Sequence, residues 1–403
     1  MKVLYTNYII TPYTHAMMEK VASKGCELVI LLPQTSDFFV GSSIESSKVT
    51  KHSYRTCYST YAAGWHGKGV LLDINSILTQ EKPDILMTGW PYIVQLFFDN
   101  KIRKTIKRHN IKLIIQEIPF QTPPFGHLSY FKNHPCYDEN MKLISTGLRF
   151  KLRSLLTMLI RKRIYSLASA TVNYSTTAYD ILPSYGVKKE SIFVRYNTVD
   201  TDALFQARKQ IEQKDRMLSE KPRIIHVGRL VKWKRVDLLI SAFGKVRESI
   251  PDCELVIIGK GPEKEVLMQQ AVDTGLSNNI VFTGGIYDPL ILGQYMYESS
   301  VYVLAGMGGL SINDAMGYSL PVICSICDGT EKDLVTDGVN GYFFKEGDAK
   351  DLAQKIVNVL SNPTKAKQMG EESYHIIRDK INLETVSQRY MDAFNYVMDT
   401  IKK

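Results

Sequence analysis

The sequence predicts an α/β protein with two parallel-sheet domains, because short β-branched runs alternate with amphipathic helical stretches along its 403 residues. This length suits two ordinary domains, each with its own core. Hydrophobic residues make up 44% and charged residues 23% of the chain, as is typical of soluble globular proteins. The alternation stops once, at the polar stretch that follows residue 206, and then restarts. We therefore expect two sheets rather than one.

Six strands are predicted in the first half, because aliphatic and β-branched residues cluster in short runs there. These runs are Val3–Tyr5, Leu28–Leu32, Asp84–Met87, Leu113–Gln116, Thr171–Tyr174 and Ile192–Arg195. Longer stretches between them repeat apolar residues at helical spacing and are predicted to be helices. They include Thr14–Lys24, Tyr92–His109 and Leu148–Leu167. We assign residues 1–198 to the first domain.

The second half repeats the alternation and is assigned to a second domain, residues 199–383. Its predicted strands are Ile224–Val227, Glu254–Ile258, Ile280–Thr283, Val301–Leu304 and Pro321–Cys324. Its predicted helices are Arg235–Arg247, Glu263–Asp273, Pro289–Tyr297, Ser311–Tyr318 and Ala349–Leu360.

The net charge of +9 favours an anionic partner. Seven basic residues and no acid lie between Lys142 and Arg163, interleaved with leucines at helical spacing. Such a helix suits an anionic membrane surface, and residues 142–164 are our candidate; a core helix with a solvated basic face is the alternative. No nucleic-acid-binding motif accompanies the charge, so we expect no nucleic acid partner. Without a membrane span or a secretory signal, we expect a cytoplasmic protein, peripheral at most on the inner face of the cell membrane.

Loops that follow strands are the place to look for a site, because open α/β sheets bind ligands outside the carboxyl ends of their strands. "HVGRLVKWKR" places Gly228, Arg229 and Lys234 after one strand, and two cations suit a diphosphate. "VIIGKGP" adds Gly259 and Gly261, and "VFTGG" adds Gly284; each of these signals is weak alone.

A fourth loop, "LAGMGGLSINDAMG", is the strongest candidate. Gly308 and Gly309 allow backbone to approach a ligand closely. The amides of Gly309, Leu310 and Ser311 are expected at a helix N-terminus, which favours anions, and Ser311 is also a candidate N-cap. Asp314, one turn later, is a candidate acceptor for sugar hydroxyls.

Taken together, these motifs resemble the family 4 glycosyltransferases of the GT-B fold, from about Arg223 to Phe344. The resemblance implies two Rossmann-like domains facing a central cleft. It also implies retaining transfer of a sugar from a nucleotide diphosphate, without a metal or other cofactor. In such enzymes the residues matching Arg229 and Lys234 hold the phosphates, and the amides from Gly309 to Ser311 contact the diphosphate or the sugar.

Two departures accompany the resemblance. The family usually carries two glutamates eight positions apart. The one that binds the ribose corresponds to Asp314, and the one that contacts the donor sugar corresponds to Gly306. The loss of the second carboxylate leaves open how the donor sugar is recognised. The glycine pair that often precedes the first helix is absent, and Thr14 and His15 are the candidates to donate hydrogen bonds in its place. Glu117 follows a middle strand where the family often has histidine. It is our candidate for a polar group near the reacting carbon, though not for a base.

In GT-B enzymes the first domain binds the acceptor and the last helix crosses back onto that domain. We therefore expect residues 384–403 to pack on the first domain, and expect a glycan acceptor that is lipid-linked or membrane-borne. The predicted function is hexosyl transfer in cell-surface polysaccharide synthesis. A nucleotide-sugar epimerase of the same fold and a non-catalytic nucleotide-sugar-binding paralogue remain open.

Overall fold

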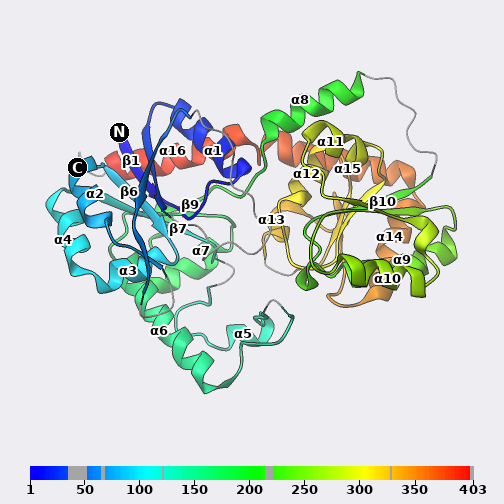
Figure 1. Ribbon diagram of the computed structural model, residues 1–403, viewed down its shortest axis with the longest axis horizontal. Helices are drawn as coiled ribbons and strands as arrows, with labels where there is room; N and C mark the ends of the chain where they lie inside the picture. Colours follow the sequence, from blue (N-terminus) through cyan, green and yellow to red (C-terminus); the bar gives the residue numbers. More distant parts are fainter. Residues whose placement is uncertain are drawn as a thin grey trace. The chain divides into compact units, whose positions relative to one another are not determined.

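The computed structural model describes residues 1–34, 52–64, 69–119, 122–138, 140–213, 221–326 and 329–399 (Figure 1). The chain forms two compact units. Unit 1 comprises Met1–Cys136, Leu143–Asn197 and Leu383–Lys403, and unit 2 comprises Tyr137–Lys142 and Thr198–Asn382. Each unit is built on one large parallel sheet with helices packed on it, so the predicted α/β class is confirmed.

Unit 1 contains a seven-stranded sheet whose neighbouring strands are all parallel. The spatial order is β3 (Arg55–Ser59), β2 (Glu27–Pro33), β1 (Lys2–Thr6), β6 (Ile85–Gly89), β7 (Lys112–Glu117), β8 (Ala170–Asn173) and β9 (Ile192–Val194). The strand order reverses between β1 and β6, which makes their carboxyl ends a topological switch point. A separate antiparallel pair is formed by β4 (Tyr61–Ala63) and β5 (Gly69–Leu71).

Two apolar clusters cover the two faces of this sheet. In one, Met18 of α1 (Pro12–Ser23) packs with Val386 and Phe394 of α16 (Leu383–Asp399), so the C-terminal helix completes the core of unit 1 (Figure 1). The other cluster includes residues of α2 (Ile74–Glu81), α3 (Tyr92–Phe98), α4 (Asn100–Arg108), α6 (Gly147–Tyr165) and the short α7 (Ala178–Ile181), together with the sheet. The short helix α5 (Tyr130–Asn133) completes the unit.

Unit 2 contains a six-stranded parallel sheet. Its order is β12 (Ile280–Gly284), β11 (Glu254–Ile258), β10 (Arg223–Val227), β13 (Val301–Leu304), β14 (Val322–Cys324) and β15 (Gly341–Phe343). Its helices are α8 (Thr201–Glu212), α9 (Val236–Ser249), α10 (Lys264–Asp273), α11 (Pro289–Tyr297), α12 (Ser311–Gly317), α13 (Glu331–Leu334), α14 (Ala349–Leu360) and α15 (Pro363–Asp379). The strand order reverses between β10 and β13, which gives unit 2 a switch point of its own.

Candidate functional site

At the switch point of unit 2, the loops after β10 and β13 are bonded to each other. The Met307 amide donates to the Trp233 carbonyl oxygen at 2.8 Å. The buried Lys234 ammonium donates to the carbonyl oxygens of Met307 and Gly308, at 2.8 and 2.5 Å. Two loops that are about 70 residues apart in the sequence are therefore joined into one surface, with the lysine as the link.

The structure gives a physical reason for glycine at position 306. A Cβ atom there would lie 2.2 Å from the Trp233 carbonyl oxygen and 2.6 Å from the Lys234 carbonyl carbon. Both are backbone atoms, which cannot move aside as easily as the end of a flexible side chain. The close packing of the two loops therefore excludes every side chain at this position, and the glutamate expected from the resemblance has no space here.

Backbone amides that lack an acceptor gather after β13. Within the part of the chain that the structure describes, the amides of Gly308, Gly309, Leu310 and Ser311 donate no hydrogen bond. A Cβ atom on Gly309 would lie 2.8 Å from the Lys234 Nζ, so backbone and ammonium approach each other closely. Unpaired amides beside a lysine suit an anion such as a phosphate.

The predicted N-cap role of Ser311 is wrong. The helix α12 has Leu310 at its N-cap position, with no side-chain bond to the backbone. The Ser311 hydroxyl is instead 2.7 Å from the hydroxyl of Tyr302, a buried residue of β13. The serine side chain therefore fixes the start of α12 to the sheet and leaves the first amides without a cap.

Asp314 lies in the first turn of α12 and is half-buried. Its carboxylate has no hydrogen-bond or ion-pair partner among the described residues. Burial raises the pKa of Asp314 to about 7, because the charged form is poorly solvated there. An unpartnered carboxylate in this position is suited to accept hydrogen bonds from a ligand's hydroxyl groups.

Three of the predicted glycines have structural roles within unit 2. A Cβ atom on Gly259 would lie 1.9 Å from the Gly228 carbonyl oxygen, and one on Gly261 would lie 2.2 Å from that of Leu230. The loops after β10 and β11 thus pack backbone against backbone. Gly284 has φ +78° and its carbonyl accepts from the Gly259 amide at 2.9 Å. Loop packing and turn geometry account for these three glycines without a ligand.

Arg229 follows Gly228 directly and is half-buried. Its guanidinium carbon lies 5.4 Å from the centre of the Trp233 ring, a cation–π contact within the same loop. The arginine therefore belongs to the loop that also carries Lys234, as the sequence motif predicts.

Unit 1 has a cavity of about 340 Å³ at its own switch point. Its walls come from residues at or just after the ends of β1, β6, β7, β8 and β9, together with the first turn of α1. They include Thr6, Asn7, Thr14, Trp90, Glu117 and Arg195. The cavity thus lies where ligands of open parallel sheets bind.

Glu117 lines this cavity from the last position of β7, not from a loop as predicted. Its Oε1 lies 3.6 Å from the Nε of Arg161, and both side chains are buried. Arg161 also lies over the Trp90 ring at 5.0 Å. Arg161 is therefore buried and is not part of the exposed basic face of its helix.

Arg195, which follows β9, was not predicted as a site residue. Its side chain is fully buried and stacks on Tyr174 and Tyr390, with its guanidinium carbon 4.0 and 5.2 Å from the ring centres. One of its amino groups donates to the Tyr196 carbonyl at 2.7 Å. Among the described residues its Nε has no acceptor and no carboxylate forms an ion pair with it. In the sequence, the only indication of a site here was that the predicted apolar strand Ile192–Arg195 ends in an arginine.

Of the two candidates near the first helix, only Thr14 lines the cavity. Its hydroxyl is 2.8 Å from that of Thr11, the residue at the N-cap of α1. His15 does not line the cavity; its Nδ1 lies 2.9 Å from the Tyr54 hydroxyl. The expectation that His15 replaces the missing glycine pair is therefore not supported by this arrangement.

The first three turns of α6 expose an apolar stripe. Leu148, Leu152, Leu155 and Leu159 are three or four positions apart, hence on one face, and each is 40–73% exposed. Exposed basic residues flank them: Arg149, Lys151, Arg153, Lys162 and Arg163. No helix in the described ranges has the length and apolarity needed to cross a membrane.

Part of the chain is similar to a known protein family. Residues 207–376 match the family model of glycosyl transferases group 1. Poly(ribitol-phosphate) alpha-N-acetylglucosaminyltransferase of Staphylococcus aureus is 26% identical over 178 residues, which are 42% of this chain and 34% of that protein. Poly(glycerol-phosphate) alpha-glucosyltransferase of Bacillus subtilis is 26% identical over 182 residues, 45% of this chain and 27% of that one. The chain thus matches about a third of the length of these relatives.

Solved structures match over the whole chain. The Anabaena Alr3699/HepE structure in complex with UDP superposes with a TM-score of 0.66 at 17% identity, covering 98% of this chain and 100% of that one. Sucrose-phosphate synthase of Thermosynechococcus elongatus gives 0.67 at 16% identity, with coverages of 99% and 100%. These likenesses establish the shared fold.

Proposed function

Because the chain resembles the family 4 glycosyltransferases and has their GT-B fold, we propose that it is a retaining glycosyltransferase. It transfers a hexose-type sugar from a nucleotide diphosphate to a glycan acceptor in cell-surface polysaccharide synthesis. One observation carries the proposal: four amides that donate no hydrogen bond within the described ranges lie beside the Lys234 ammonium at the switch point of unit 2. That arrangement suits the diphosphate of a sugar donor.

In this proposal the donor lies on the carboxyl edge of the unit 2 sheet. Lys234, Arg229 and the amides from Gly309 to Ser311 neutralise the two phosphates, so no metal is needed for the leaving group. Asp314 accepts from the ribose hydroxyls. Since Gly306 leaves no room for a carboxylate, backbone groups of the same loop take over contact with the sugar.

The chemical step needs no protein base. The bond between the anomeric carbon and the β-phosphate oxygen breaks, and the acceptor oxygen bonds to the same face of that carbon. The acceptor's proton passes to the leaving phosphate oxygen. Glu117, held by Arg161, acts as a fixed polar group in the unit 1 cavity and not as a proton acceptor.

The buried Arg195 supports an acceptor that carries an anionic group. A buried cation is costly unless it is paired with an opposite charge. In the described chain the printed partners of Arg195 are two aromatic rings, a carbonyl oxygen and the Met17 sulfur, and none of them is charged. A phosphate or carboxylate entering the cavity would supply the missing charge. Two relatives are named for poly(ribitol-phosphate) and poly(glycerol-phosphate) substrates, which is consistent with this chemistry.

Arg195→Lys tests this acceptor class, because lysine keeps the charge but loses the forked donor pair. We expect KM for a phosphate-bearing acceptor to rise by about tenfold or more, the loss of one charged hydrogen bond, while donor affinity is unchanged. Phosphate-free acceptors serve as the matched control. Equal KM values for wild type and variant with both acceptors would refute an anionic acceptor group.

We place the enzyme on the inner face of the cell membrane, where a lipid-linked acceptor is accessible. The exposed leucine stripe of α6 and its flanking cations support contact with anionic lipid. The cytoplasmic side is the side on which nucleotide sugars are supplied to such an enzyme.

The central test is calorimetry with uridine and guanosine diphosphates, followed by incubation with nucleotide sugars. Transfer to an acceptor with an unchanged anomeric configuration is the expected result. Isomerisation of the donor without acceptor would indicate an epimerase, and no binding of any diphosphate would indicate a non-catalytic protein. Lys234→Ala should lower kcat/KM by about 10²-fold or more, as loss of a transition-state donor does.

A further inference from the structure

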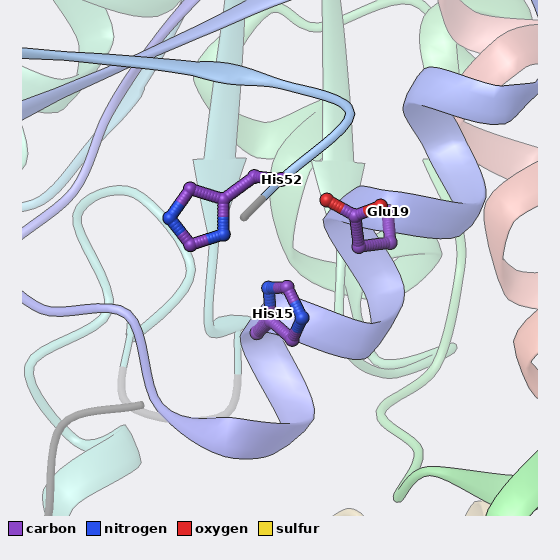
Figure 2. A group of neighbouring side chains, drawn as sticks. All are labelled: His15, Glu19 and His52. Carbon is purple, nitrogen blue, oxygen red and sulfur yellow. The ribbon is translucent and has the colours of Figure 1, made fainter. Parts of the chain in front are cut away.

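A second group of side chains in unit 1 has the composition of a metal site. His15 and Glu19 lie four positions apart on α1, hence on one face, and His52 lies opposite them just before β3 (Figure 2). One ligand atom from each of the three residues lies within 4.8 Å of the others. The cluster belongs to unit 1 and is formed by residues other than those that line the cavity.

The neighbouring residues hold two of these ligands in place. The Tyr54 hydroxyl lies 2.9 Å from the Nδ1 of His15, which orients that ring. Ser53 donates to both Glu19 oxygens, from its amide and its hydroxyl, at 2.7 Å each. A carboxylate has about four lone-pair sites, so Glu19 retains capacity for a cation. Such outer contacts are typical around metal ligands.

The third residue of the cluster, His52, has a buried ring nitrogen that is unsatisfied within the described chain. The Nδ1 of His52 is buried and has no hydrogen-bond partner in the described chain. The ring of His52 stacks on Tyr54, with centroids 4.8 Å apart and an interplanar angle of 6°. Its direction is thus fixed by the residue that also orients His15. A buried nitrogen without a partner is unfavourable, and a cation would satisfy it.

We propose that His15, Glu19 and His52 bind one Zn²⁺ ion. Two imidazoles and a carboxylate are a zinc ligand set that leaves a fourth position for water, whereas Mg²⁺ and Ca²⁺ prefer oxygen ligands alone. Tetrahedral zinc needs ligand atoms about 3.3 Å apart, given Zn–N bonds of about 2.0 Å, so the side chains close in by about 1.5 Å. The ion joins α1 to the segment that enters β3.

The test uses the tag-free full chain, dialysed against a chelator and titrated with Zn²⁺ against a chromophoric competitor. Wild type should bind one ion per chain. Glu19→Gln and His52→Ala should each weaken binding by about tenfold or more, at least the loss seen for second-shell changes. His134→Ala removes an exposed histidine elsewhere in unit 1 and should bind as wild type does.

Two further readouts make the outcome decisive. Zn²⁺ should raise the melting temperature of wild type but not of His52→Ala, because a ligand stabilises only the state that binds it. Co²⁺ in place of Zn²⁺ should give the intense visible absorption of a tetrahedral site. Absence of Zn²⁺ binding by wild type, or equal binding by all three variants, would overturn the proposal. Melting of the metal-free variants identifies any that fail to fold.

Discussion

A methyl group on Gly306 would lie 2.2 Å from the carbonyl oxygen of Trp233, far inside ordinary contact. Gly306→Ala should therefore lower the free energy of unfolding by about 1–3 kcal/mol, as overpacking does, and Gly306→Glu should lower it further. Urea unfolding measures this. Gly244→Ala is the control: its new Cβ would meet only Leu276, at 3.6 Å, and α9 would gain helix propensity. A Gly306→Ala protein as stable as wild type would show that the loops are not packed in this way.

The raised pKa of Asp314 provides a test of its proposed role in nucleotide binding. Because burial raises its pKa to about 7, the ionised form, which we propose accepts the ribose hydroxyls, becomes dominant only above that pH. We expect affinity for a nucleoside diphosphate to rise between pH 6 and pH 8 more steeply in wild type than in Asp314→Asn. The ligand's own phosphate titrates equally in both, so the difference between the two proteins isolates Asp314. Parallel profiles in calorimetry would exclude this carboxylate from the site.

The raised pKa of Asp314 also makes the stability of the folded protein depend on pH. The carboxyl has a higher pKa in the folded protein than in the unfolded chain, where it is about 3.9. The folded state therefore holds the proton more tightly, and its contribution to stability is lost as pH rises from about 4 through about 7. Asp314→Asn should be more stable relative to wild type at pH 8 than at pH 4.

At the scale of elements, the strands of both sheet centres could be predicted because buried parallel strands are continuous apolar runs. β3, with its sequence Arg55–Ser59, was missed because it is a polar edge strand, and α15 because its surface is mostly polar. The predicted helix from Tyr92 to His109 is divided in two, since the Asp99 carboxylate accepts from the amides of Lys101 and Ile102 and starts α4.

The polar stretch that follows residue 206 was predicted to interrupt the alternation of strands and helices, and no helix was predicted in it. The structure shows that α8 continues through it as far as Glu212; residues 214–220 lie outside the described residues. Arg208 accounts for part of this, because its guanidinium donates to the Gly317 carbonyl and stacks on Tyr374. Contacts with distant residues decide the structure of such a segment, and a local pattern does not contain them.

In the candidate site, too, local motifs could be read from the sequence, whereas contacts between distant residues could not. Lys234 and Arg229 were predictable, because glycine-rich loops with cations after apolar strands have a sequence signature. The reason for glycine at position 306 was not, because it depends on a backbone contact with a loop about 70 residues away. Arg195 was missed for a similar reason: its burial between Tyr174 and Tyr390 unites three distant segments.

The exposed stripe of α6 yields a prediction for the element as a whole. Leu152→Asp combined with Leu159→Asp should reduce flotation with anionic vesicles by about tenfold or more, since it removes two apolar side chains and adds two negative charges. The melting temperature should not change, because both leucines are exposed. Val266→Asp, on the exposed face of α10, is the matched control. Equal flotation of all three proteins, or equal recovery with neutral vesicles, would contradict membrane docking by α6.

At the scale of the whole molecule, the chain crosses between the two units four times, so each unit includes a segment that is distant in the sequence. Unit 1 takes its last helix from residues that follow the whole of unit 2 in the sequence. The core of unit 1 includes Tyr390 and Phe394 of α16, which are fully buried. The stability of unit 1 therefore depends on the C-terminus, whereas the proposed donor site depends on unit 2.

This separation allows the location of nucleotide binding to be tested. Phe394→Asp places a charge in the core of unit 1 and should cost more than the roughly 3–5 kcal/mol of a Phe→Ala change there. Asn395→Asp introduces the same side chain at the next, exposed position and should be neutral. In calorimetric melting, the transition lost or lowered by Phe394→Asp is that of unit 1. A nucleoside diphosphate at 100 times its Kd should raise the other transition, by a stabilisation of about 2.7 kcal/mol. If the ligand instead raises the transition that Phe394→Asp removes, the nucleotide binds unit 1 and the assignment of the donor site to Lys234 and its loops is wrong.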